Sequence, residues 1–119
     1  MADAPIIVFP SAGAFERWLE VHAAEQAGVW LKIAKQKSGI PSITSDEAVD
    51  VGLCFGWISG QRKGLDETWY LQKYVPRRRR SAWSLLNVRK VAALTAQGRM
   101  RPGGEEEVRR ARADGRWPV

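Results

Sequence analysis

The sequence predicts a small α+β domain in which a mainly antiparallel sheet of three or four strands packs against about four helices. Three observations support this prediction: a capping box at Thr44–Glu47, a run over 48–57 that is apolar on nearly every side, and three stretches of alternating polarity. At 119 residues, the chain is long enough to bury one hydrophobic core. The expected element order is β-α-β-α-β-β-α-α.

The first elements are a short edge strand, a helix and a second strand. Ile6–Phe9 is a brief apolar run that predicts the edge strand. Ser11 is expected to cap a helix over about 12–26, because apolar residues recur there with helical spacing. Val29–Lys35 alternates apolar and polar residues, which predicts a strand with one buried face.

The middle of the chain is expected to hold the central helix and a hairpin. The capping box begins a helix over about 45–57, and its apolar surface on all sides indicates that it is buried. Ile58–Lys63 and Glu67–Val75 flank a turn-forming Gly-Leu-Asp sequence, which predicts a hairpin. We expect residues 1–5 to be disordered and residues 6–119 to form the single domain.

Two helices are expected at the C-terminal end. Ser81 or Ser84 caps a third helix that reaches about Gln97, where a glycine follows. Pro102 is expected to prevent this helix from resuming, so that a short fourth helix begins at Glu105. Acidic residues in its first turn and arginines in its last turn agree with the helix dipole.

The positive charge is concentrated in the last third of the chain. The whole sequence carries a formal charge of +6, but residues 1–75 hold seven Lys/Arg against nine Asp/Glu. Residues 76–119 hold twelve Lys/Arg against four Asp/Glu. A partner recognised by its charge is therefore expected to bind the C-terminal part.

The candidate site is the segment that contains four consecutive arginines and leads into the third helix. Arginine binds phosphate or carboxylate through two parallel N–H donors, and a helix N-terminus adds backbone donors and a positive dipole end. Because four adjacent guanidiniums cannot all face one ligand, some of them are expected to be spectators. The predicted anion-binding residues are Arg77, Arg78, Arg80, Ser81, Trp83 and Ser84.

Other chemistries have weaker support. The sequence has one cysteine, Cys54, and one histidine, His22, so neither a disulfide nor a Cys/His metal site is expected, and no cofactor is predicted. No phosphate-binding glycine loop, nucleophile elbow or zinc-protease motif occurs. No catalytic residue is assigned, and a non-enzymatic protein is favoured. The N-terminus has no signal-like segment and no window is apolar enough to span a membrane, so a cytoplasmic location is expected.

A set of short motifs carries a family resemblance over about Trp18 to Trp117. The motifs are Gly28–Lys35, Pro41–Thr44, Glu47–Asp50, Cys54–Ile58, Gly64–Glu67 and Pro76–Ser84. As a set they resemble the bacterial YdeI/OmpD-associated family, also called bacteriocin-protection proteins. The resemblance implies a small α+β protein linked to survival under antimicrobial peptides and envelope stress, with no established reaction; some descriptions of that family place it in the periplasm. Ser59 departs from the pattern, since an Asp is usual there, and so does Tyr74-Val75, where Phe-Thr is usual.

Three functions are therefore expected in order of preference. The first is a monomeric, non-enzymatic protection factor that binds an anionic small molecule or an acidic protein surface through residues 76–87. Its protection would be indirect, because a protein of charge +6 repels cationic peptides. The second is a nucleic-acid-binding protein that uses the arginines and stacks a base on Trp83. The third is an enzyme acting on a small phosphorylated or carboxylated molecule.

Overall fold

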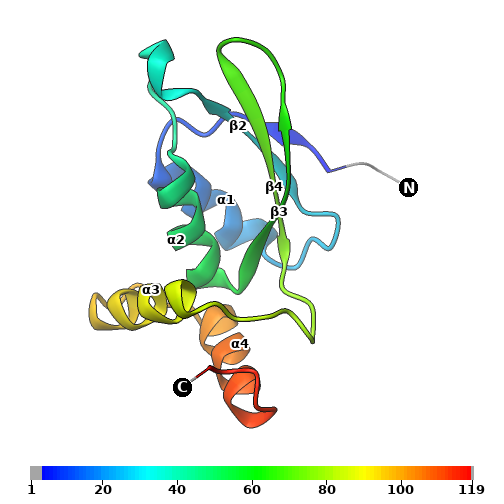
Figure 1. Cartoon of the computed structure of the whole chain (residues 1–119), viewed down its shortest axis with the longest axis vertical. Coiled ribbons are helices and arrows are strands. Elements are labelled where there is room, and N and C mark those ends of the chain that lie inside the picture. Colours follow the sequence, from blue (N-terminus) through cyan, green and yellow to red (C-terminus); the bar gives the residue numbers. More distant parts are fainter. Residues whose placement is uncertain (1–3, 119) are drawn as a thin grey trace.

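The molecule is built on a four-stranded sheet with the strand order β1-β2-β4-β3 (Figure 1). The computed structural model describes residues 4–118. Strands β2 (Val29–Ala34), β4 (Trp69–Pro76) and β3 (Trp57–Gly64) pair antiparallel, and β1 (Ile6–Ile7) adds to β2 in parallel at one edge. The α+β class and the predicted element order are confirmed.

The N-terminal segment that was expected to be disordered falls only partly within this description. Residues 1–3 lie outside the described residues. The carbonyl oxygen of Pro5 accepts a hydrogen bond from the N–H of Trp30 at 2.8 Å, which extends the pairing of β1 with β2. Pro5 is therefore held at the sheet edge.

Helices α1 (Ala12–His22) and α2 (Ser45–Phe55) cover one face of the sheet (Figure 1). The Ser11 hydroxyl accepts a hydrogen bond at the start of α1, as predicted, and the reciprocal capping box is present at the start of α2. Helix α1 ends at His22 rather than near residue 26, because the backbone then closes two successive turns. Gly56 ends α2 with φ of 78°, so the next residue begins β3 instead of extending the helix.

The hairpin between β3 and β4 has the predicted turn. The Asp66 carboxylate accepts hydrogen bonds from the backbone N–H groups of Thr68 and Trp69, both at 2.8 Å. These bonds lower the pKa of Asp66 below its ordinary value. The side chain therefore acts in turn formation, as the sequence indicated.

Helices α3 (Leu85–Ala96) and α4 (Pro102–Ala113) lie beyond one end of the sheet (Figure 1). The prediction that Pro102 would delay α4 until Glu105 is wrong. Proline occupies the first helical position, where the missing N–H has no intrahelical role. A Cβ atom on Gly104 would lie 2.3 Å from the carbonyl oxygen of Cys54, so the absence of a side chain lets α4 begin directly against the end of α2.

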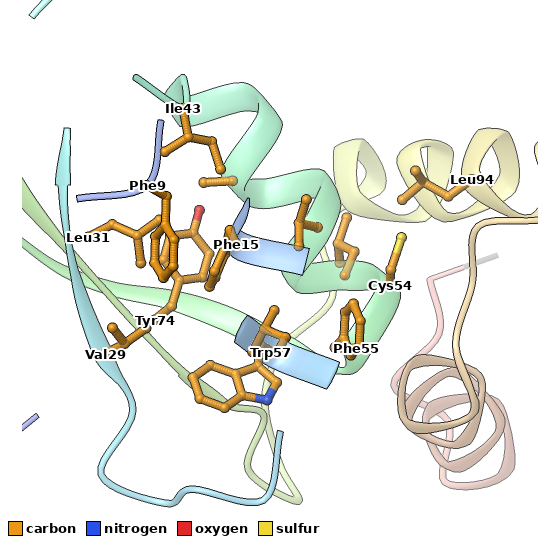
Figure 2. Close-up of a cluster of buried hydrophobic side chains, with 14 of the residues drawn as sticks. Phe9, Phe15, Val29, Leu31, Ile43, Cys54, Phe55, Trp57, Tyr74 and Leu94 are labelled. Carbon is orange, nitrogen blue, oxygen red and sulfur yellow. The ribbon is translucent and has the colours of Figure 1, made fainter. Parts of the chain in front are cut away.

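The hydrophobic core lies between the sheet and α1 and α2, and it continues toward α3 and α4 (Figure 2). Tyr74 is 1% exposed, and its hydroxyl has no hydrogen-bond partner in the part of the chain that the structure describes. Side chains that are fully buried come from every layer and include Phe15, Leu19, Leu31, Ile43, Val51 and Trp57. Within residues 4–118, no helix combines the length and the apolar character that crossing a membrane requires.

Candidate functional site

The arginine segment connects the end of β4 to the start of α3, and its first arginine is buried. Arg77 is 7% exposed, whereas Arg78, Arg79 and Arg80 are exposed. The backbone N–H of Arg77 donates to the carbonyl of Gly56 at 2.9 Å, so the chain is still held beside β3 at this point. Arg77, one of the predicted anion-binding residues, is therefore part of the buried structure.

Arg77 packs against the indole ring of Trp83. Its Cζ atom lies 3.7 Å from the ring centroid, and one Nη1–H donates to the carbonyl oxygen of Ala82 at 3.2 Å. Nε and Nη2 are buried and have no hydrogen-bond partner among residues 4–118. Burial lowers the pKa of Arg77 to about 10, an effect that Glu107 opposes and Arg116 reinforces. The guanidinium thus remains charged near neutral pH and contributes to packing.

Trp83 is enclosed on more than one side. It is 7% exposed, and its ring centroid lies 5.0 Å from that of Trp117, near the C-terminus. With Arg77 and Trp117 against it, the indole offers no open face to a base. Trp83 therefore anchors the segment to the C-terminal residues, and the stacking role expected for it has no available surface.

The two serines of the predicted site are used locally. The Ser84 hydroxyl accepts a hydrogen bond from the N–H of Asn87 at 3.1 Å and caps α3. The Ser81 hydroxyl accepts one from the N–H of Arg78 at 3.0 Å and closes a turn. Of the two capping alternatives, Ser84 is the cap. Both hydroxyls thus shape the segment.

Two of the exposed arginines face the end of α4. Arg79 and Arg80, together with Arg110 and Arg116, line an open hollow of about 500 Å³ that Ala113 and Asp114 complete. No residue of α3 lines this hollow, so the N-terminus of α3 is not part of it. We call these six residues the basic groove. The groove joins the loop between β4 and α3 to the last turn of α4 and the residues that follow it.

The charges of the groove are only partly neutralised. Arg116 contacts Asp114 at 2.8 Å and also donates to the carbonyl of Ser81 at 2.9 Å. Arg110 contacts two glutamates one turn earlier in α4, at 3.2 and 3.5 Å. Arg79 and Arg80 form no ion pair with any carboxylate in the described part of the chain. The groove therefore has an excess of positive charge.

Of the four arginines that line the groove, only Arg80 is among the residues predicted from the sequence. Arg79, Arg110 and Arg116 are not. The available signal was the concentration of basic residues after residue 76, which placed a charged partner in this third of the chain. That signal could not indicate which turn of α4 would lie beside the loop.

A larger hollow of about 920 Å³ lies between α3 and α4. Its walls are mainly apolar, with Val91, Met100 and Val108 among them, and Arg109 and Arg112 contribute charge. Arg109 contacts Glu106, and the guanidinium of Arg112 lies 5.0 Å from the Trp117 ring centroid. Because its arginines already have partners, this hollow is a weaker candidate for binding an anion.

Among residues 4–118, no group of three or more His, Cys, Asp or Glu side chains could hold a metal ion. His22 contacts Glu25 at 3.2 Å and stacks on Trp18, with ring centroids 4.4 Å apart. Cys54 is buried, and this burial raises the pKa of its thiol. These contacts account for both residues as parts of the fold.

The chain belongs to the family described as a domain of unknown function, DUF8412, whose sequence model matches residues 7–107. This span contains Arg79 and Arg80 and ends before Arg110. Neither the curated proteins nor the solved structures contain a match to the chain.

Proposed function

We propose that this DUF8412 domain binds a phosphate-bearing ligand in the basic groove and does not act on it chemically. One observation carries the proposal: two arginines that have no carboxylate partner within residues 4–118 share an open hollow with Arg110 of α4 and with Arg116, which follows α4. Guanidinium groups on two sides of a hollow suit an anion that accepts several hydrogen bonds at once.

The size and openness of the groove favour a ligand with accessible phosphates. A hollow of about 500 Å³ is within the range of small-molecule sites, whereas the narrow hollow of about 20 Å³ beside Arg77 has room for about one water molecule. The carboxylate of Asp114 is held by Arg116 at 2.8 Å and is not free to act as a base. The groove therefore supports binding more than catalysis.

The biological setting that we propose is indirect protection under antimicrobial peptide stress. This setting rests on the sequence resemblance to the YdeI/OmpD-associated family alone. The net charge of +6 argues against capture of cationic peptides, so the protein would act through its anionic ligand. A chromosomal Arg79→Gln/Arg80→Gln allele should then lower survival under a cationic peptide as much as deletion of the gene.

Titration with inorganic phosphate and pyrophosphate, followed by amide NMR shifts, tests the binding. We expect shifts at residues 78–81 and 110–116, with pyrophosphate binding more tightly. Arg79→Gln/Arg80→Gln should weaken binding by roughly 5- to 30-fold, since exposed arginine contacts contribute about 1 kcal/mol or less each. Thermal stability should not change, because both side chains are exposed.

Arg89→Gln is the matched control, because Arg89 is exposed on α3 and does not line the groove. It should bind both anions like the wild type. Amides of 78–81 and 110–116 that do not respond at moderate salt would contradict the proposal. A response to oligonucleotides but not to pyrophosphate, with a steep salt dependence, would favour a nucleic-acid ligand in the groove.

A further inference from the structure

The face of the sheet that points away from the core is not covered by a helix in the described chain (Figure 1). Val29, Leu31 and Ile33 of β2 are buried in the core. Because side chains alternate along a strand, Trp30 and Lys32 point to the opposite, outer face. Both are partly exposed.

The strand register brings aromatic and basic residues together on this outer face. Trp30 is directly opposite Lys73, and Ala34 is directly opposite Trp69. Leu71 of β4 has Lys32 opposite it on one side and Lys63 of β3 on the other. Residues directly opposite one another share a face of the sheet. The outer face thus carries two tryptophans and three lysines from three strands.

The lysines lie over the indole rings. The Nζ atoms of Lys63 and Lys73 are 4.9 and 5.4 Å from the Trp30 ring centroid. The Nζ atom of Lys32 is 4.9 Å from the Trp69 ring centroid. Trp30, on β2, therefore reaches across β4 toward a lysine of β3. These distances are within the range of cation–π contacts.

The face has a positive charge that nothing on it balances. Within residues 4–118, none of these three lysines has a carboxylate oxygen within 4.0 Å. The strand positions on this face include no aspartate or glutamate. The nearby Asp66 is in the hairpin turn, where two backbone N–H groups hold its carboxylate.

We propose that this outer face binds single-stranded nucleic acid, with bases stacked on Trp30 and Trp69 and phosphates bound by Lys32, Lys63 and Lys73. Unpaired bases expose a flat ring for stacking, and a row of cations follows the backbone, which is how sheet platforms bind single strands. A duplex buries its base faces and does not fit this arrangement. The lysines that now cover the rings would move onto phosphates when a base takes their place.

The spacing of the two tryptophans sets a minimum length for the ligand. Trp69 is opposite Ala34, four positions along β2 from Trp30, so the backbone positions of the two tryptophans are separated by about 13 Å along the strands. One base cannot reach both rings, and a site of on the order of four or more nucleotides is expected. The site is independent of the basic groove, which lies at the end of α4.

Fluorescence titration of the full chain with ten-nucleotide oligouridylate and oligothymidylate tests the proposal, with a ten-base-pair duplex for comparison. Stacking should quench tryptophan emission with either single strand. Trp30→Leu or Trp69→Leu should weaken binding by about 5- to 100-fold. Each lysine replaced by glutamine should reduce the slope of log K against log salt by about 0.7. Lys37→Gln, an exposed lysine outside this face, is the matched control and should bind like the wild type.

Two further results separate this site from the basic groove. If Arg79→Gln/Arg80→Gln removes oligonucleotide binding while the sheet variants retain it, the proposal is wrong and nucleic acid binds the groove. Equal binding of the duplex, or unchanged affinity in both tryptophan variants, would also overturn it. If the tryptophan variants unfold, the double variant Lys63→Gln/Lys73→Gln tests the proposal instead, because these side chains are not in the core. A loss of affinity with an unchanged melting temperature would then support the site.

Discussion

Cations lie over tryptophan rings both at the end of β4 and on the outer sheet face, and the two places differ in burial. The Arg77–Trp83 pair is buried, with each residue 7% exposed. The Trp30 ring with Lys63 and Lys73 is on an open face, and its residues are partly or fully exposed. The same pair of chemical groups therefore stabilises the fold in one place and is available to a ligand in the other.

The difference comes from what surrounds each ring. At Trp83 the other contact is Trp117, which follows α4 and covers the segment from the C-terminal side. At Trp30 the neighbours are flexible lysine side chains, which water or a ligand can displace. A cation over a ring is thus a candidate binding site only where the neighbours of the ring are mobile enough to be displaced.

The largest expected effect is at Arg77. Arg77→Ala should lower the free energy of unfolding by about 2–4 kcal/mol, because it leaves a cavity against Trp83 and removes the bond to the Ala82 carbonyl. Lys73→Ala should change it by less than about 0.5 kcal/mol. Urea unfolding of the two variants measures the difference. Equal effects would contradict the contrast between the two regions.

Arg77→Met sharpens this comparison. The methionine keeps much of the apolar stem and removes two buried donors, Nε and Nη2, that have no partner among the described residues. Because unpaired buried donors are destabilising, Arg77→Met should lower the free energy of unfolding by less than half as much as Arg77→Ala does. A loss as large as that of Arg77→Ala would instead mean that the charge itself stabilises the fold.

The next effect is expected at the tryptophans. Trp83→Leu should destabilise the protein by about 2 kcal/mol, since a smaller side chain leaves space between Arg77 and Trp117. Trp30→Leu should cost about 1 kcal/mol or less, because the ring is already partly exposed. Thermal unfolding with matched buffers distinguishes them. If Trp30→Leu were more destabilising than Trp83→Leu, Trp83 would be the more exposed of the two rings and the comparison would be wrong.

The smallest effect is expected at Tyr74, which lies on β4 between the two regions and faces the core. Tyr74→Phe should leave the stability at neutral pH unchanged or raise it by about 1 kcal/mol, because the buried hydroxyl has no partner within residues 4–118. Burial raises the pKa of Tyr74 above its ordinary value. Loss of stability on removing the hydroxyl would reveal a hydrogen bond to water.

The pH dependence of this variant has a definite sign. Above about pH 10 the unfolded state releases the tyrosine proton while the folded state retains it, so alkali reduces the stability of the wild type. Tyr74→Phe lacks this contribution, and its stability should fall less steeply above that pH. Urea midpoints between pH 8 and pH 11 measure both curves, and parallel curves would contradict the burial of the hydroxyl.

Local signals in the sequence determined most of the fold. The Thr44–Glu47 box, the Asp66 turn and the Ser84 cap each depend on groups within about four residues, so their hydrogen bonds can be predicted from the chain itself. The alternation in Val29–Lys35 also separated a buried face from an outer one. The position of Trp30 on that outer face was therefore accessible from the sequence.

Tertiary packing decided which of these groups are available to a ligand. Four consecutive arginines have the same chemistry, and tertiary contacts, among them those with Trp83 and Gly56, bury the first of them. The basic groove requires the end of α4 beside a loop some thirty residues earlier, an approach that begins where Gly104 lets α4 contact α2. The burial of Arg77 and the convergence of arginines in the basic groove depend on contacts between segments distant in the chain. The spacing of residues within one segment therefore cannot predict them.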